Sequence, residues 1–196
     1  MDEDLERQLG FLLELDRLKE VERQTLLADS SRLENSAEHS WHLAVMAVVL
    51  GGHAPPGTDL GRVATMVVLH DIVEIDAGDL YVYAPETDQA SYHKAEAAAA
   101  ERIFGLLPPA EGERLRAVWE EFEDRRTAEA RFARALDRLQ PMLLNYRIGG
   151  QEWRAHGVTA SQVLAKVELI EDGSATLGRY ARELIESAVR QGFLPQ

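Results

Sequence analysis

Apolar residues recur at steps of three and four along most of the chain, as in amphipathic helices, and no stretch alternates as a half-buried strand would. The segment 3–19 shows this spacing at Leu5, Leu9, Leu12, Leu13 and Leu15. Residues 20–35 are irregular and polar, so neither a helix nor a strand is predicted there. Ser36 is a suitable N-cap for a helix over residues 36–50, which is apolar on all sides beyond His42 and is therefore expected in the centre of the fold.

Capping residues, prolines and glycines divide the rest of the chain into further helices. These are predicted over residues 59–77, 87–106, 109–123, 128–147, 159–172 and 174–191, with a loop over 148–157. Gly78 is a stop signal, Thr127 is an N-cap, and the run from Thr159 to Gln162 has the form of a capping box. The pattern predicts one all-α domain over residues 1–196, with seven or eight helices, in which the helices within 158–191 complete the core.

Composition narrows the classes of protein. The 196 residues are 45% hydrophobic and 28% charged, which is typical of a soluble globular protein. A formal net charge of −13, without a basic stripe, argues against binding to a nucleic-acid polymer or to an anionic membrane. The longest apolar run, Leu43–Leu50, is too short to cross a bilayer, and the acidic N-terminus lacks a signal-peptide pattern, so we expect a cytoplasmic protein. Because the chain has no cysteine, any metal must be held by His, Asp or Glu.

The stretch MVVLHDIVEIDAGD at residues 66–79 carries ionisable groups in a segment that is otherwise built for burial. On a helix, His70 and Glu74 lie on one face, and Asp71 lies next to Glu74. Burying such groups without partners costs several kcal/mol each. A bound divalent metal would offset that cost, and imidazole and carboxylate are suitable ligands. For one His-Asp pair alone, a buried hydrogen bond is the simpler interpretation.

Two further ionisable residues lie on helices expected to be central. His39 is in NSAEHSWH and Asp137 is in RALDRLQP. Taken alone, each is typical of a core residue whose hydrogen bonds are satisfied or of a residue exposed to solvent. With His70-Asp71 they make the ordered set His, His-Asp, Asp, which resembles the metal site of the HD-domain phosphohydrolase superfamily.

Three longer runs extend this resemblance over roughly residues 5–150. RLENSAEHS is similar to the R-x-E-N-x-x-E-H-S run of the bacterial 5′-deoxynucleotidase branch, and LHDIVEIDAGD to its H-D-x-x-E-x-x-x-G-D run. WEEFEDRRTAEARFARALDRLQP resembles a further segment of that branch, which the human HD-domain-containing protein 2 type shares.

The resemblance implies a metal centre within residues 23–140. His39, His70, Asp71 and Asp137 would hold one divalent ion (Mn, Co, Mg, Fe, Ni or Zn) and leave positions open for water and substrate. Dinuclear relatives add further histidines between the His-Asp pair and the last Asp. Only His93 lies in that interval, which favours a single ion.

The same resemblance suggests roles for residues around the metal. Glu74 would be a catalytic acid or base, or would orient water. Asp79 would contact the substrate sugar or the attacking water, although a turn aspartate is the alternative. Arg23 is the best match to the family's phosphate-binding Arg and Arg32 the second; either could instead be a surface residue, and Arg32 could pair with Glu34 or Glu38. Gln24 stands where the branch has a Trp near the sugar, which puts the sugar preference in question.

The leading hypothesis is a metal-dependent phosphohydrolase that converts (deoxy)nucleoside 5′-monophosphates to nucleoside and phosphate. The alternatives are an HD phosphohydrolase acting on another phosphorylated small molecule, and a helical metal-binding domain without catalytic activity. We also expect a homodimer, because Trp119, Phe122 and Phe132 are apolar residues on long helices and suit an interface between subunits. Trp119 and Phe122 are equally suited to a core.

Overall fold

The computed structural model describes residues 2–84 and 86–195, without the side chains of residues 86–90, and it confirms an all-α fold. The helices are α1 (Glu3–Glu14), α2 (Ser36–Leu50), α3 (Leu60–Leu69), α4 (Glu74–Ala77), α5 (Glu86–Phe104), α6 (Pro109–Asp124), α7 (Ala128–Arg147), α8 (Gln151–Ala155), α9 (Ala160–Gly173) and α10 (Ala175–Arg190). Two short 3₁₀ helices, η1 (Leu15–Glu20) and η2 (Gly51–His53), follow α1 and α2, and the strands are β1 (Glu22–Leu26) and β2 (Leu33–Asn35).

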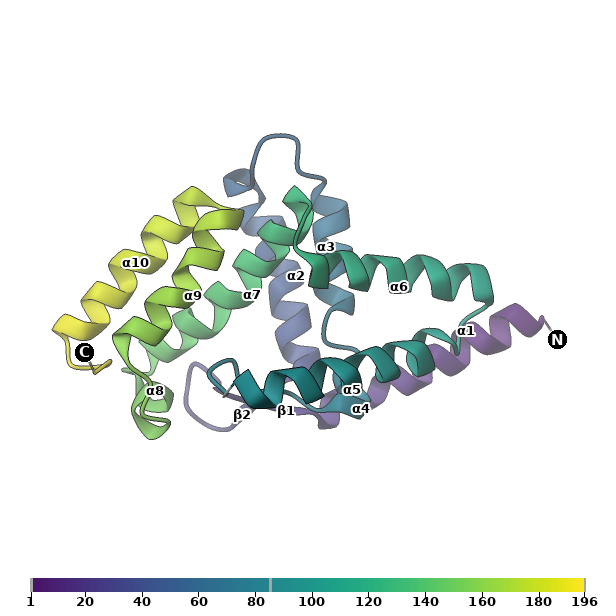
Figure 1. Cartoon of the computed structure of the whole chain (residues 1–196), viewed down its shortest axis with the longest axis horizontal. Helices are drawn as coiled ribbons and strands as arrows, with labels where there is room; N and C mark the ends of the chain where they lie inside the picture. Colours follow the sequence, from purple (N-terminus) through teal and green to yellow (C-terminus); the bar gives the residue numbers. More distant parts are fainter. Residues whose placement is uncertain (1, 85, 196) are drawn as a thin grey trace.

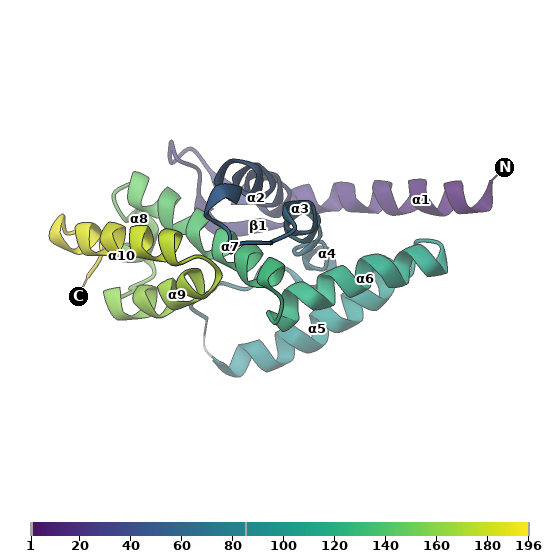
Figure 2. The same ribbon diagram turned by 90° about the horizontal axis from the view of Figure 1, so that it is seen from above.

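Helix α7 occupies the middle of the fold. It packs against α9 and α10 on one side and against α2 and α3 on the other (Figure 1). Helix α1 extends away from these helices toward the end of the molecule formed by α5 and α6 (Figures 1 and 2). The central position of α7 allows side chains from several helices to meet around it.

Most of the predicted helix starts are confirmed. Thr127 caps α7 by accepting a hydrogen bond from the backbone N–H of Ala130 at 3.1 Å, and Thr159 forms the predicted capping box with Gln162. The prediction for α2 was wrong by one residue. Its N-cap is Asn35, which forms a capping box with Glu38, and this moves Ser36 into the first turn, where it is buried.

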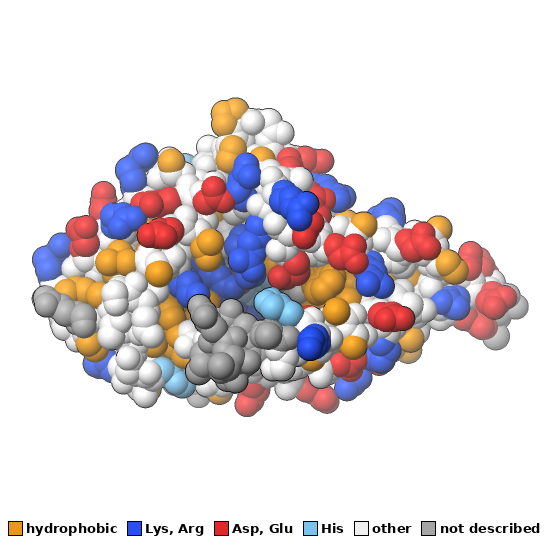
Figure 3. Space-filling model, in the orientation of Figure 1, with side chains coloured by type: hydrophobic (Ala, Val, Ile, Leu, Met, Phe, Trp, Pro, Cys, Tyr) orange, Lys and Arg blue, Asp and Glu red, His pale blue; other side chains and the backbone are white. Residues whose placement is uncertain are grey.

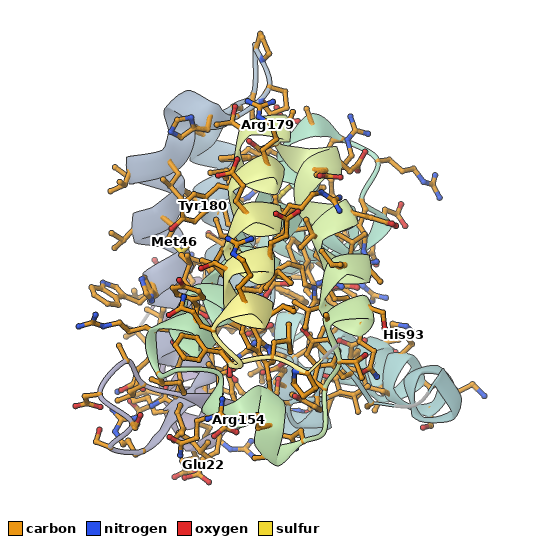
Figure 4. All side chains as sticks on the ribbon, turned by 90° about the vertical axis from the view of Figure 1, so that its left-hand side faces the viewer. Glu22, Met46, His93, Arg154, Arg179 and Tyr180 are labelled. Carbon is orange, nitrogen blue, oxygen red and sulfur yellow. The ribbon has the colours of Figure 1, made fainter. Side chains whose placement is uncertain are left out.

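Three predictions of local structure are wrong. Residues 20–35 include a two-stranded antiparallel sheet that pairs Glu22 with Asn35, and the predicted loop 148–157 contains α8. In Figure 4, Arg154 of α8 and Glu22 of β1 lie at the same edge of the molecule, where α8 packs against β1. The predicted helix 59–77 is broken, because α3 ends at Leu69 and turns lead into α4.

The expected positions of two apolar groups are also corrected. Helix α2 is not enclosed on all sides: its apolar outer face leaves Trp41 68%, Val48 77% and Val49 71% exposed. In contrast, Phe132, which we expected at an interface, is buried in the core, as are Trp119 and Phe122, for which a core position was the alternative. No helix in the described part of the chain is long and apolar enough to cross a membrane.

Close contact between α9 and α7 depends on Gly173. A Cβ atom at this position would lie 2.2 Å from the carbonyl oxygen of Arg131 and 2.7 Å from Cβ of Ala135. We therefore expect Gly173→Ala to lower the free energy of unfolding by about 1–3 kcal/mol, because the backbones must separate. Urea denaturation followed by circular dichroism measures this change.

The matched control is Gly10→Ala in α1, where an added Cβ meets nothing within 4 Å. This substitution should raise stability by about 0.5–1 kcal/mol, because Ala loses less backbone entropy than Gly in a helix. Equal effects of the two substitutions would contradict the packing argument.

Candidate metal centre

Three buried side chains from three helices converge beside α7. His39 is in the first turns of α2, His70 directly follows α3, and Asp137 is in the middle of α7. One potential ligand atom from each residue lies within 4.8 Å of the other two. The packing of α2 and α3 against α7 therefore brings together three of the four residues expected to bind metal.

Hydrogen bonds orient both imidazole rings toward this point. The Val67 carbonyl oxygen lies 2.9 Å from His70 Nδ1, and the Gln140 side-chain oxygen lies 3.1 Å from His39 Nδ1. Both oxygens are acceptors, so each Nδ1 carries a proton and each Nε2 is directed toward the common point, where a metal ion could bind. His70 Nε2 is buried there and lies 2.9 Å from Oδ1 of Asp71.

The electrostatics of the cluster also favour a cation. Burial raises the pKa of Asp137, but Arg138 and the two histidines outweigh it and hold the pKa well below its usual range. Burial lowers the pKa of His70, but the carboxylates of Asp71 and Asp137 outweigh it and raise the pKa to about 10. His70 therefore holds a proton where a divalent ion would compete for the same nitrogen.

Asp71 lies at the edge of this cluster. Its Oδ1 is 2.9 Å from His70 Nε2, whereas its Oδ2 accepts a hydrogen bond from Arg23 Nη1 at 2.7 Å. Asp71 does not belong to the group of mutually close ligand atoms formed by His39, His70 and Asp137. One carboxylate oxygen thus faces Nε2 of His70 and the other orders Arg23.

Arg23 on β1 is surrounded by carboxylates. Besides Asp71, its Nη1 lies 3.5 Å from Asp79 and 4.0 Å from Glu74, and its Nε lies 3.9 Å from Glu34. Burial lowers the pKa of Arg23, but these carboxylates outweigh it and raise the pKa above its usual value. Arg23 therefore stays charged and holds Asp71 and Asp79 near the histidines.

Glu74 is a buried carboxyl group with a specific partner. Its Oε2 accepts a hydrogen bond from the Ser36 hydroxyl at 2.6 Å. Burial and the neighbouring charge of Asp71 raise the pKa of Glu74 well above its usual value, and burial likewise raises the pKa of Asp79. Its raised pKa thus suits Glu74 to hold and release a proton.

A cavity of about 220 Å³ opens beside these residues and is lined by Arg23, Gln24, His70, Asp71, Glu74, Asp79 and Asp137 among others. Arg32 is not one of its lining residues. It is exposed and forms a bidentate ion pair with Glu38 at 2.8 and 2.5 Å, so the structure separates it from the other predicted substrate-binding residues.

Two residues that hold the His39 ring in place through hydrogen bonds, Gln140 and Glu34, were not identified from the sequence. Gln140 accepts from His39 Nδ1 and donates from its Nε2 to Glu34 at 2.7 Å. Gln140 also lies 3.2 Å from His42 Nδ1, so His42 joins this network. The available signal was the spacing, since Gln140 lies three residues after Asp137 and so shares a face of α7.

We expect Gln140→Leu to weaken Mn²⁺ binding about 10–100-fold, because His39 loses the acceptor that fixes its tautomer and orientation. Isothermal titration calorimetry measures the affinity. Gln151→Leu, at an exposed glutamine of α8, is the control and should bind Mn²⁺ as the wild type does. Unchanged affinity in Gln140→Leu would contradict the supporting role of Gln140.

A helical fold in which two imidazoles and a carboxylate from separate helices meet at one buried point defines a helical metalloprotein. More narrowly, the chain belongs to the HD domain family, whose profile matches residues 15–177. This confirms the resemblance that the spacing of His39, His70-Asp71 and Asp137 suggested.

Named relatives and solved structures agree with this family. Human 5′-deoxynucleotidase HDDC2 is 30% identical over 136 residues, which are 69% of this chain and 65% of that protein, slightly less than two thirds of its length. The 5′-deoxynucleotidase PM0747 of Pasteurella multocida (strain Pm70) is 36% identical over 110 residues, 50% of this chain and 53% of that protein. A similar crystal structure is that of a protein from Magnetospirillum magnetotacticum MS-1, which is named as a predicted metal-dependent phosphohydrolase. Its sequence is 50% identical, and the two structures match with a TM-score of 0.95 over 98% of this chain and 96% of that one.

Proposed function

We propose that this protein is a metal-dependent phosphohydrolase that hydrolyses (deoxy)nucleoside 5′-monophosphates to nucleoside and phosphate. The observation that carries the proposal is the convergence of His39, His70 and Asp137 beside the buried carboxyl group of Glu74. The names of the human and Pasteurella relatives, both 5′-deoxynucleotidases, support the substrate class.

The proposed metal is one divalent ion held by His39, His70 and Asp137, with Asp71 as a further ligand. When bound, such an ion polarises a phosphate oxygen and lowers the pKa of water. Its identity among Mn, Co, Mg, Fe, Ni and Zn is left open by the donor set, because imidazole and carboxylate suit several of these ions. His93 is 61% exposed at its side chain and pairs with Glu96, which supports a single ion rather than two.

The residues around the ion have distinct proposed roles. Glu74, whose pKa is raised by burial, holds a proton and gives it to the leaving 5′-oxygen, while the Ser36 hydroxyl fixes the carboxyl group. Arg23 holds Asp71 and Asp79 in place, and its Nε, which is buried without a hydrogen-bond partner, is available to a phosphate oxygen. Gln24 lines the cavity beside Arg23 and is the proposed contact to the sugar.

Two alternatives are an HD phosphohydrolase for another phosphorylated small molecule and a helical metal-binding domain without turnover. The second alternative does not account for Glu74 and Asp79. Both have raised pKa values, and both lie within 4.0 Å of Arg23 rather than within the group of ligand atoms. A purely structural metal site has no need of such proton-holding groups.

Phosphate release from matched ribo- and deoxyribonucleoside 5′-monophosphates tests the proposal. The metal-stripped protein should be inactive, and Mn²⁺, Co²⁺, Mg²⁺ or Ni²⁺ added singly should restore release. The ratio of deoxy to ribo activity, compared with that of Gln24→Trp, reports on the role of Gln24. Absence of release from every monophosphate with every metal would exclude the proposed function.

We also propose that the chain is a single cytoplasmic domain that forms a homodimer and binds neither nucleic-acid polymers nor membranes. The net charge of −13 supports the last point. The exposed face of α2, formed by Trp41, Val45, Val48 and Val49, supports a second copy as the covering partner. Light scattering should show a dimer for the wild type and a monomer for Val48→Glu; a monomeric wild type would exclude the homodimer.

A further inference from the structure

Four cations line the cavity beyond the metal centre. Arg125 lies just before α7, Arg134 and Arg138 are on α7, and Lys166 is on α9. We call these four residues the cationic wall. Figure 3 shows Lys and Arg side chains gathered in the hollow at the centre of this face. The chain as a whole is strongly acidic, so its overall charge does not explain why four cations gather in this cavity.

The cationic wall has few carboxylate partners. Arg134 Nη1 and Arg138 Nε lie 3.2 and 3.6 Å from Oδ2 of Asp137, whose Oδ1 faces the two histidines. Arg125 lies 3.9 Å from Glu123, and no ion pair of Lys166 is found among the side chains of residues 2–84 and 91–195. The remaining positive charges repel one another, and an anion in the cavity would relieve that repulsion.

The cationic wall also has hydrogen-bond donors without acceptors. The Nε atoms of Arg125, Arg134 and Arg138 are buried and have no hydrogen-bond partner among the residues that the structure describes. A buried donor without an acceptor destabilises the protein. Phosphate offers several strong acceptor oxygens to guanidinium groups, so a phosphate group satisfies both the charge and the donors.

One phosphate at the metal centre does not account for this wall. In the proposed function, the reacting phosphate would bind at the metal ligands and Arg23. The cationic wall begins on the other side of Asp137, at Arg134 and Arg138, and continues across to Lys166 on α9. An anion there would be adjacent to the reacting phosphate, as the next phosphate of a chain is.

We propose that the cationic wall binds a second phosphate group linked to the one at the metal centre, so that the site takes nucleoside 5′-diphosphates and 5′-triphosphates as well as monophosphates. This inference rests on the proposed function and enlarges its substrate class. Tyr81, Tyr83 and Trp153 line another part of the same cavity, which leaves aromatic groups for the nucleoside.

Calorimetric binding of dAMP and dADP tests the inference. The Glu74→Gln protein, saturated with Mn²⁺, is used so that turnover is suppressed. We expect dADP to bind about 10–100-fold more tightly than dAMP, because one charge-assisted hydrogen bond contributes about 1.5–3 kcal/mol. Adding Lys166→Gln should reduce that preference about tenfold, because the wall loses one of its four cations.

The matched control is Arg179→Gln, which removes one positive charge from an exposed position on α10 (Figure 4). It should leave the preference for dADP unchanged. Equal affinities for dAMP and dADP, or an equal preference with and without Lys166, would overturn the inference. Phosphate release by the wild type decides the proposed function separately, so hydrolysis of dAMP without a preference for dADP excludes only the second phosphate site.

Discussion

Replacing Asp137 with Asn should reduce metal-dependent phosphate release about a thousandfold or more. The substitution keeps the shape of the side chain but removes the negative charge that faces His39 Nε2 at 3.1 Å. Without it the centre retains two neutral imidazoles and Asp71, and the ion is held weakly. A catalytic metal contributes several kcal/mol to transition-state stabilisation, and each 1.36 kcal/mol is about a tenfold change in rate.

The measurement is phosphate release at a fixed Mn²⁺ concentration, together with Mn²⁺ affinity by calorimetry. Asp172→Asn, at the exposed end of α9, removes a carboxylate of the same size and should leave both quantities unchanged. Because Arg134 and Arg138 also lose their carboxylate partner, a thermal melt must show that Asp137→Asn is folded. Wild-type Mn²⁺ affinity in the folded variant would refute the role of Asp137 as a ligand.

Glu74→Gln should lower kcat about 10²–10⁴-fold while Mn²⁺ affinity stays within a few-fold of the wild type, which is the magnitude typical of a lost general acid. The amide cannot deliver a proton to the leaving oxygen, yet it is nearly the same size and can still accept the hydrogen bond from Ser36. The separation of the two readouts distinguishes Glu74 from the metal ligands.

Asp76→Asn is the control for Glu74→Gln, because Asp76 lies two residues away in α4 and pairs with Arg102 outside the cavity. It should retain full activity and lose at most about 1 kcal/mol of stability, as expected for a surface ion pair. If Glu74→Gln kept full kcat, or if it lost Mn²⁺ as Asp137→Asn does, the proton-donating role of Glu74 would be wrong.

The helices with strong local signals were predictable from the sequence. Thr127 and the capping box at Thr159 place the starts of α7 and α9, because their side chains satisfy backbone donors within the same turn. The hairpin of β1 and β2 was not predictable from hydrophobic alternation. Its inward-facing side chains, Arg23, Thr25 and Glu34, are polar residues that the site buries.

The sequence indicated which residues form the candidate site better than it indicated how their side chains are arranged. The ordered pattern of His39, His70-Asp71 and Asp137 identified the family, because these residue types are rarely placed in apolar segments without a partner. The pairing of Asp71 with Arg23 and the support of His39 by Gln140 depend on how β1 and α7 meet in space. Arg32 pairs with Glu38, which was one of the alternatives given for it, and it does not line the cavity.

The hydrogen bonds behind the metal centre join parts of the chain that are far apart. His39 reaches Asp137 across 98 residues and Gln140 across 101, and Gln140 reaches Glu34 across 106. Closing loops of that length is entropically expensive, so such contacts form late in folding. A metal bound there should therefore leave the refolding rate nearly unchanged and lower the unfolding rate. The bound ion would thus lengthen the lifetime of the folded state.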